Sequence, residues 1–440
     1  MRLHDIAFYV ALFFILGVGA ASLEFNIWLF LILSVISGFT LPILLSKSTI
    51  VSLLNKFFVA VFVFISFLGF FYYHFYFAFQ SESIVFNKEI VFQGEVVREP
   101  THGLKTEEVD VRLRSPYEGE ARIYAQPTRN LHYGDLLEIK GEIMKSPTGR
   151  LNIVSFPEVS IVSRNNGNLI KTKLFQLKEK LIANLNAVLA PQQAALMSGI
   201  LLGERAEFTP EFKKQLNRSG TTHIVALSGY NISIIGLTLM GILGLFFRKR
   251  WAFYLSLFVI PLFVIMTGGE ASVIRAGIMG MIVLLAQKQS RLYSFRNAVT
   301  ITALVMLILN PKLLASDVGF QLSFAALLGI VYLFPYLEKQ LGWQDKEGSV
   351  FELKKTGLQT FSAQVAVAPI LLTTFGYFSP TALMANILIL TFIPLTMFFG
   401  FLTAILGFVS YELSLVMGLF TNFILSYEIL VIKFFALSWL

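Results

Sequence analysis

The sequence predicts a polytopic α-helical membrane protein that carries one small extracytoplasmic β-barrel domain. Hydrophobic residues make up 55% of the 440 residues and the mean hydropathy is +0.70, values typical of multi-span membrane proteins rather than of a soluble chain with a large core. Apolar runs long enough to cross a bilayer as helices alternate with short loops. Between residues 86 and 165 the pattern changes to short alternating segments separated by glycine and proline, which favours β-structure there.

The first predicted domain, residues 1–80, consists of membrane spans. The apolar runs are Ile6–Ala21, Ile27–Leu45 and Phe57–Phe79. The first run lacks a convincing small-residue cleavage site and two more spans follow at once, so it is not a cleavable signal peptide. Lys47 and Lys56 lie between the second and third runs, whereas no basic residue lies between the first two. The positive-inside rule therefore places the N-terminus in the cytoplasm and the end of the third span outside.

The second predicted domain, residues 86–165, has about five short strands with period-2 alternation, which is typical of a small closed barrel and favours an OB-like fold. The predicted strands are Val91–Val97, Val109–Leu113, Ala121–Tyr124, Leu136–Ile143 and Leu151–Val154. OB barrels often bind single strands by stacking bases on aromatic side chains beside basic residues. The residues that could contact DNA in this way are Arg112, Arg114, Arg122, Tyr124, Arg129 and Tyr133. The alternative is a structural cap whose charges are solvated. Lys88–Arg164 contains 11 basic and 12 acidic residues, and this nearly neutral balance favours the structural cap at least as much as contact with DNA.

Residues 170–220 are predicted to form amphipathic and re-entrant helices. Lys171–Ala190 has an apolar stripe at Leu174, Leu177, Leu181, Leu185 and Val188. It is expected to lie on the outer membrane surface or to brace the barrel. Pro191 suits the first turn of Gln192–Leu202, which is too short to span and is therefore re-entrant or packed on protein. Thr209-Pro210 predicts the N-cap and first turn of a basic helix that stops near Gly220.

Residues 221–440 are predicted to be the transmembrane core. The expected spans are Thr222–Phe247, Trp251–Thr267, Val273–Ala286, Ala298–Leu309, Val318–Phe334, Thr356–Phe375, Pro380–Val409 with a break at Pro394, and Leu413–Leu437. In this arrangement every basic cluster lies on the cytoplasmic side, as at Arg248-Lys-Arg250. The chain then has about eleven spans, with the C-terminus outside.

Polar residues within these apolar runs are candidates for the lining of a passage, because polar groups at membrane depth need partners or water. The candidates are His223, Ser228, Gly229, Asn231, Glu270, Ser272, Arg275, Asp317, Gln321, Gln364 and Asn386. A charge such as that of Arg275 costs about 2.5–3.5 kcal/mol to insert at the centre of a span. One interpretation is structural: small and polar residues join helices, and Arg275 pairs with Glu270 or Asp317. The other is functional: Arg275 faces a water-filled path that carries an anion, and broken helices line that path.

The sequence shows no sign of an enzyme. There is no phosphate-binding loop, no His-Glu-x-x-His motif and no cysteine, so we expect no catalytic residue, metal site or cofactor. Any energy for transport must then come from a partner or a gradient.

Several short motifs, taken in order, resemble the ComEC competence family. They are Leu201-Leu-Gly-Glu-Arg205, His223-Ile-Val-Ala-Leu-Ser-Gly229, Ser272-Val-Ile-Arg-Ala276, Pro311 through Gly319-Phe-Gln-Leu-Ser-Phe324, and Gln364 with Pro369, Phe375-Gly-Tyr-Phe-Ser-Pro380 and Ala385-Asn386. The resemblance implies an inner-membrane channel that takes single-stranded DNA into transformable bacteria. It also implies contact with membrane lipid and with a DNA receptor, a separate nuclease and a cytoplasmic helicase or motor.

Two features depart from the family pattern. Asn231 occupies the position, two residues after the Ser-Gly pair, where members often have histidine. Many members also carry a C-terminal metallo-β-lactamase-like domain, whereas this sequence ends at Leu440, directly after its last expected span. The resemblance therefore implies the channel form without the nuclease domain. Two other functions fit the same polar residues: a small-solute or lipid transporter with an external lid, and a non-transporting membrane assembly protein whose barrel docks a partner.

Overall fold

In the computed structural model the chain divides into two units. Unit 1 comprises Met1–Glu82 with Ile282–Gln321, and unit 2 comprises Ser83–Met281 with Leu322–Leu440. The structure describes residues 3–24, 49–79, 84–102, 106–127, 131–145, 152–204, 208–225, 227, 231–232, 234–236, 241, 244, 247–288, 295–343, 349–376 and 381–437.

Unit 1 is built on two long apolar helices, α1 (Leu3–Ser22) and α3 (Thr49–Phe79), which pack closely. A Cβ on Gly17 would overlap the Ser66 carbonyl oxygen, and a Cβ on Gly69 would overlap that of Phe14. Small residues of this kind let two helical backbones approach in a membrane. The other helices of this unit are α11 (Phe295–Leu309) and α12 (Leu313–Ser316). The expected span Ile27–Leu45 lies outside the described residues.

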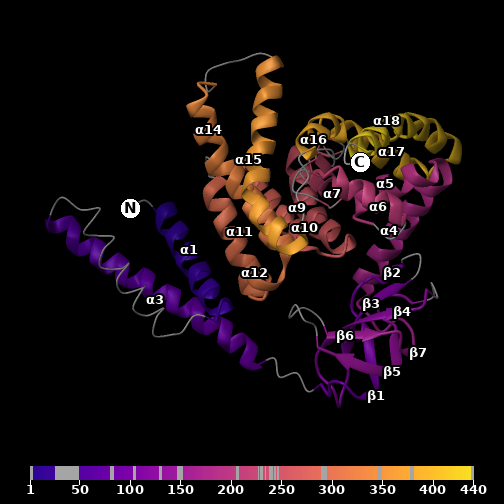
Figure 1. Cartoon of the computed structure of the whole chain (residues 1–440), viewed down its shortest axis with the longest axis horizontal. Coiled ribbons are helices and arrows are strands. Elements are labelled where there is room, and N and C mark those ends of the chain that lie inside the picture. The colour runs from indigo at the N-terminus through magenta and orange to yellow at the C-terminus, as the bar shows by residue number, and fades with distance from the viewer. Residues whose placement is uncertain are drawn as a thin grey trace. The chain divides into compact units, whose positions relative to one another are not determined.

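Unit 2 begins with a closed five-stranded barrel (Figure 1). Its strands are β1 (Glu89–Val96), β3 (Glu107–Leu113), β4 (Glu120–Ala125), β6 (Asn152–Ser155) and β5 (Leu136–Met144). The circuit closes because β1 pairs with both β3 and β5. All of its pairings are antiparallel except that of β4 with β6. Each of the five predicted strands corresponds to one strand of this circuit.

Two further strands were not predicted, β2 (Thr101–His102) and β7 (Glu158–Ser163). β2 extends β3 by only two residues, and β7 lies along β5 with none of its residues fully buried. A strand is recognised in a sequence by alternation of apolar and polar residues, which arises when one face is buried. A strand without a buried face lacks this pattern and is not predicted.

Three helices follow the barrel: α4 (Leu169–Val188), α5 (Pro191–Leu202) and α6 (Pro210–Arg218). The predicted start signals are confirmed. Pro191 opens α5, and the Thr209 hydroxyl accepts a hydrogen bond of 3.2 Å from the backbone N–H of Phe212 at the start of α6. From Ala194 to Leu202 every residue of α5 is buried, so this short helix is packed on protein.

The helix α4 packs against α5, α9, α17 and α18 rather than presenting a free amphipathic face. Its buried residues are Phe175, Lys178, Leu181 and Leu185. The prediction that Leu177 belongs to the buried stripe was wrong, since its side chain is 42% exposed. Leu181 and Leu185 of the predicted stripe are buried, whereas in the first half of the helix the buried side chains are those of Phe175 and Lys178.

The remaining helices of the core are α7 (Thr222–Val225), α9 (Lys249–Met266), α10 (Ala271–Lys288), α13 (Val318–Leu328), the π-helix η1 (Gly329–Leu333), α14 (Phe334–Gln340), α15 (Ser349–Phe375), α16 (Ala382–Leu390), α17 (Ile393–Leu406) and α18 (Tyr411–Leu437). The expected break at Pro394 is present: α16 and α17 meet at 52°, with Pro394 in the first turn of α17.

Among the described residues, four helices are long and apolar enough to cross a membrane: Asp5–Ser22, Ala60–Ala78, Val318–Gln340 and Tyr411–Leu437. The bent α16–α17 pair would be a fifth. Helices α9, α10 and α11 are apolar but shorter, and half of the expected span Thr222–Phe247 lies outside the described residues. The molecule is thus rich in membrane-type helices, while the total of about eleven spans stays a prediction.

Candidate functional site

Arg275 is a buried cation near the start of α10. Its side chain is 7% exposed, one Nη donates a hydrogen bond to the Ser323 carbonyl of α13, and the guanidinium lies 5.8 Å from the centre of the Phe324 ring. The Nε–H has no hydrogen-bond partner. Within the described part of unit 2, Arg275 forms no ion pair with Glu270, and Asp317 belongs to unit 1. Its charge is therefore held by a carbonyl dipole and an aromatic face, without neutralisation by a carboxylate.

Asn231 and Ser272 hold the backbone around Arg275. The Asn231 amide donates a hydrogen bond of 3.1 Å to the Ile200 carbonyl, one of the last carbonyls of α5, which have no partner within their own helix. The Ser272 hydroxyl donates a hydrogen bond of 2.9 Å to the Leu227 carbonyl. These two bonds tie Asn231 to α5 and Leu227 to α10.

An apolar contact accompanies these bonds, since Leu227 and Ile232 pack on Val273 and Ala276. The structural interpretation of these polar side chains, as links between helices, therefore fits Asn231 and Ser272.

Several other candidates serve helix ends and turns. His223 and Glu270 are exposed, at the end of α7 and just before α10. The Asp317 carboxylate accepts a hydrogen bond of 2.7 Å from the Phe320 N–H at the start of α13. The Gln321 amide donates to the carbonyls of Leu314 at 2.9 Å and Ala315 at 3.0 Å.

The last candidates in the core are Gln364, Asn386, Ser228 and Gly229. Gln364 is half-buried in α15. Asn386 is 1% exposed in α16, and its amide oxygen has no partner. Ser228 and Gly229 lie outside the described residues.

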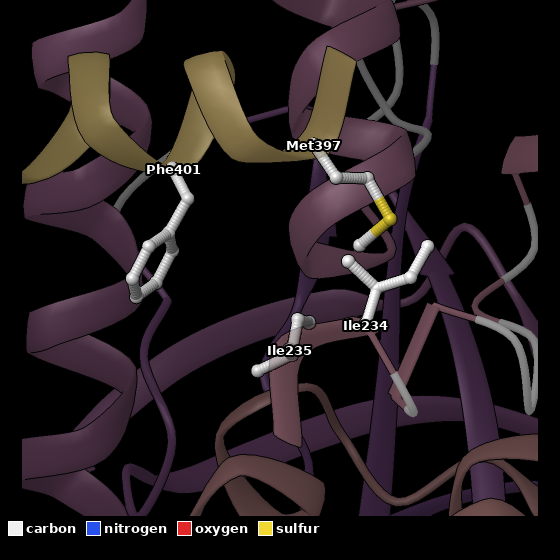
Figure 2. A pocket seen from close by; sticks show the side chains of 4 residues that line it. All are labelled: Ile234, Ile235, Met397 and Phe401. Carbon is white, nitrogen blue, oxygen red and sulfur yellow. The ribbon is translucent and has the colours of Figure 1, made fainter. Parts of the chain in front are cut away.

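The cavity found in the core lies between residues 234–235 and α17, and it is apolar (Figure 2). Its lining consists of Ile234, Ile235, Met397 and Phe401. It takes no side chain from Arg275, Ser272 or Asn231, so a polar passage past Arg275 stays a prediction.

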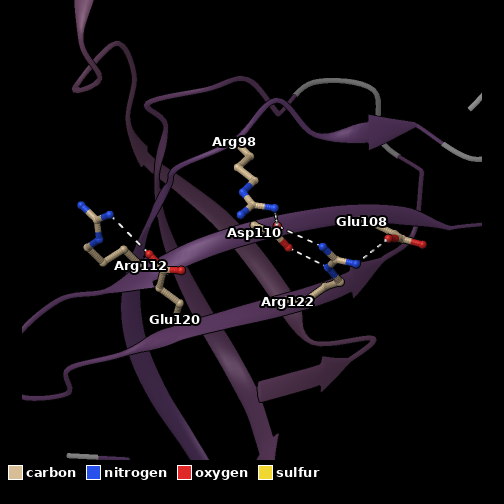
Figure 3. Close-up of polar contacts among 6 residues, drawn as sticks. All are labelled: Arg98, Glu108, Asp110, Arg112, Glu120 and Arg122. Atoms are coloured by element: carbon tan, nitrogen blue, oxygen red, sulfur yellow. Dashed lines mark hydrogen bonds and ion pairs between the residues drawn. The ribbon is translucent and has the colours of Figure 1, made fainter. Parts of the chain in front are cut away.

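On the barrel, strands β3 and β4 present a charged face on which arginines and carboxylates alternate (Figure 3). Arg122 donates to both carboxylate oxygens of Asp110, at 2.7 and 3.0 Å, and to Glu108 at 3.4 Å. Arg112 reaches Glu120 on the neighbouring strand at 3.3 Å. The hydrogen bonds from Arg122 to Asp110 raise the pKa of this guanidinium above its usual value. The arginines of this face are neutralised by carboxylates of the same face, which favours the structural-cap interpretation over contact with DNA.

The other barrel candidates are also engaged. Arg114 pairs with Glu95 at 2.9 Å, and Tyr124 is half-buried. The Tyr133 hydroxyl accepts a hydrogen bond of 3.1 Å from the Asn168 N–H, and its ring packs on Phe175 of α4 at 5.3 Å. Arg129 lies outside the described residues. Tyr133 therefore joins the barrel to α4 instead of offering a free stacking surface.

The sequence predictions missed several buried ionisable groups, of which Lys178 and Glu428 lie among the helices. The Lys178 ammonium in α4 lies 2.6 Å from a Glu99 oxygen and 2.9 Å from a Glu204 oxygen. Glu428 in α18 is fully buried, and one carboxyl oxygen lies 2.5 Å from the Thr396 hydroxyl of α17. Glu428 stands in the apolar run Phe423-Ile-Leu-Ser-Tyr-Glu-Ile-Leu-Val-Ile432, which is the same signal that identified Arg275. In the described ranges no group of three or more histidine, aspartate or glutamate side chains could hold a metal ion.

Comparison with known proteins bears on the stretch that contains Arg275 and Glu428. A family model described as Competence protein matches residues 200–439. ComE operon protein 3 of Bacillus subtilis (strain 168) is 27% identical over 244 residues, an alignment that covers 54% of this chain and 30% of that protein. No solved structure matches the chain. Since the family model covers more than half of the 440 residues, including α10, α17 and α18, this chain belongs to the ComEC-type competence protein family.

Proposed function

We propose that this chain is an inner-membrane channel that passes single-stranded DNA into the cytoplasm of a bacterium during natural transformation. The observation that carries the proposal is the family match over residues 200–439, because this stretch contains most of the membrane-type helices. Competence is the capacity to take up DNA, and a polyanion can cross a bilayer only through protein.

Arg275 supports a path for a polyanion. A strand that carries one negative charge per nucleotide is stabilised by positive and donor groups along its route, and acidic groups repel it. Arg275 is a buried cation whose charge no carboxylate of the described chain neutralises, and its Nε–H is free to donate. In this proposal Asn231 and Ser272 hold the helices that position it. Ser228, Gln364 and Asn386 supply further polar lining, and Gly229 supplies a small surface.

The proposed topology has about eleven spans in the bacterial cytoplasmic membrane, with the N-terminus in the cytoplasm and the barrel and C-terminus outside. The chain contains no cysteine, so a single introduced thiol reports its own location. Thr101→Cys, on the exposed edge of β2, should react with a membrane-impermeant thiol reagent in intact spheroplasts. The matched variant Arg248→Cys, at an exposed position in the basic cluster between expected spans, should react only after lysis. The reverse pattern would contradict this topology.

The barrel is proposed to be an OB-like domain that caps the outer side and docks a partner, since its arginines are already paired. A DNA receptor, a separate nuclease and a cytoplasmic motor are the partners that the function requires. We propose no nuclease or ATPase activity for this chain. Metal-dependent DNA cleavage by the purified protein, abolished by a point substitution within it, would contradict that.

The experiment that tests the function is uptake of fluorescently labelled DNA by a deletion strain of the source bacterium. Uptake should be lost on deletion and restored by this chain. A small-solute or lipid transporter would leave DNA uptake intact on deletion. A non-transporting assembly protein would show loss on deletion but tolerate Arg275→Gln, because its passage would be filled with side chains.

A further inference from the structure

Glu428 lies in the interface between α17 and α18, in the interior of unit 2. Its side chain is 0% exposed, and the two helices that it joins contribute Ile393, Met397, Leu425 and Ile432 to the buried apolar core of the unit. The two helices are joined along a polar seam: Thr396 contacts Glu428, and the hydroxyls of Thr403 and Thr421 lie 2.9 Å apart. The carboxyl is thus one member of a row in which every other member is a neutral hydroxyl.

The hydrogen bonds of Thr396 indicate where the proton is. The Thr396 Oγ1 lies 3.1 Å from the Phe392 carbonyl oxygen and 2.5 Å from Glu428 Oε1, but a hydroxyl has a single hydrogen. If Glu428 were ionised, Thr396 could donate to only one of these two acceptors. If Glu428 is a carboxylic acid, its O–H donates to Thr396 and Thr396 donates to the Phe392 carbonyl, so both short contacts are hydrogen bonds.

The rest of the surroundings agree with a neutral acid. Glu428 Oε2 has no hydrogen-bond partner, whereas an ionised carboxylate accepts several bonds. Burial of an unpaired charge is far more costly than burial of a neutral polar group, and such groups neutralise instead.

The elements that pack against α18 supply no counter-charge in the part of the chain that the structure describes. They are α4, α5, α6, α16 and α17. Helices α5, α16 and α17 contain no charged residue at all. On α6, Glu211, Lys213 and Lys214 are exposed and Arg218 is half-buried, and none of them forms an ion pair with Glu428.

The charged side chains of α4 are either bound to other residues or exposed to solvent. Lys178 is bound by Glu99 and Glu204. The others, Lys171, Lys173, Glu179 and Lys180, are exposed. On α18 itself, Lys433 donates to Gln192 at 3.1 Å, Glu412 accepts from the Ser410 hydroxyl, and the Tyr427 ring packs on Phe392.

We propose that Glu428 is a proton-binding site inside the helical core, protonated in this conformation and exchanging its proton with water when the α17–α18 contact opens. Loss of the proton would leave a buried carboxylate with the Thr396 hydroxyl as its single donor, and that hydroxyl would give up its bond to the Phe392 carbonyl, which would keep the backbone N–H of Thr396 at 2.9 Å. Because a buried charge with so few partners is costly, ionisation disfavours the closed contact, and the proton acts as a ligand that stabilises the packing of the two helices. This inference does not depend on DNA as the transported substrate.

The test is infrared difference spectroscopy of the purified full chain in lipid nanodiscs at neutral pH. The wild-type spectrum minus that of Glu428→Gln should contain the C=O stretching band of a protonated carboxylic acid, and Thr396→Val should shift this band by removing its hydrogen-bond partner. The matched control is Glu412→Gln, an exposed glutamate on the same helix, whose difference spectrum should show a carboxylate band and no acid band.

Exchange into deuterium oxide tests whether the site binds protons from water. The acid band of wild type should shift to lower frequency during incubation in deuterium oxide. Absence of the acid band, or an acid band that never responds to deuterium oxide, would overturn the proposal. The glutamine variant is an isostere that can still bond Thr396, and its native elution on size exclusion would show that the comparison is made between folded proteins.

Discussion

Lys178 and Glu428 are both buried ionisable groups of unit 2, but their surroundings differ. Lys178 is enclosed by two carboxylates, Glu99 and Glu204, within 2.6 and 2.9 Å. Glu428 has one hydroxyl neighbour and, in the described part of the chain, no counter-ion. A buried charge persists where an opposite charge compensates its lost hydration, and where none is available the group takes or releases a proton.

The difference corresponds to two roles. Glu99 follows β1, Lys178 is in α4 and Glu204 follows α5, so the Lys178 cluster joins the barrel to the helices as a fixed ionic link. The Glu428 contact joins two helices, and in our proposal it is stable only while the buried carboxyl keeps its proton. The first link is constitutive and the second responds to protons.

The largest expected effect is that of removing the cation from the Lys178 cluster. Lys178→Met should lower the free energy of unfolding of unit 2 by about 3–5 kcal/mol, because two carboxylates with only 18% and 19% of their side chains exposed would be left side by side without a cation. Thermal unfolding of the purified protein measures this. Lys173→Met is the matched control, since Lys173 is exposed on the same helix and should change stability by less than about 1 kcal/mol. Equal effects of the two variants would mean that the cluster is not buried.

The contribution of the Lys178 cluster to stability should also depend on pH. Burial raises the pKa of Glu99 above its ordinary value of 4.5, despite the opposing effect of Lys178. Burial lowers the pKa of Lys178, but Glu204 and Glu99 together raise it more, so this pKa ends above 10.5 and Lys178 stays charged. Because folded Glu99 binds its proton more tightly than unfolded Glu99, its contribution to stability is present at low pH. That contribution is lost as the pH rises from about 4.5 through the raised pKa.

Glu99→Gln removes this titration. The stability of wild type relative to Glu99→Gln should therefore fall as the pH rises from about 4.5 towards neutrality, as measured by melting temperatures across that range. A relative stability that rises with pH would show that Lys178 depresses the pKa of Glu99 and that burial does not dominate.

The smallest effect is expected on the charged face of the barrel. Arg112 and Glu120 are both more than 40% exposed, with side-chain exposures of 66% and 43%, so their ion pair is screened by water. Arg112→Gln should change the free energy of unfolding by less than about 1 kcal/mol. It should also leave the retention of single-stranded DNA by the purified protein unchanged in a filter-binding assay. A clear loss of DNA retention would restore the prediction that this face contacts DNA.

The helix starts and strands that are determined by residues close together in the sequence were predictable. Pro191 and Thr209 mark helix starts by backbone chemistry, and the barrel strands alternate with a period of two. The face of α4 that is buried was not fully predictable, since it depends on which helices pack on it, and the burial of Lys178 was therefore missed. Arg275 was identified because a cation in an apolar run is costly. Its acceptor, the Ser323 carbonyl, carries no sequence signal because every residue has one.

The most direct test of the proposed channel compares Arg275→Gln with Arg275→Lys in the deletion strain, with DNA uptake and protein abundance measured together. If Arg275 serves a path for DNA, Arg275→Gln should reduce uptake by about tenfold or more, equivalent to ~1.4 kcal/mol, at wild-type abundance. Arg275→Lys should retain part of the uptake because it keeps the charge. Wild-type uptake in Arg275→Gln, or a loss of abundance that fully accounts for the lost uptake, would contradict the channel site.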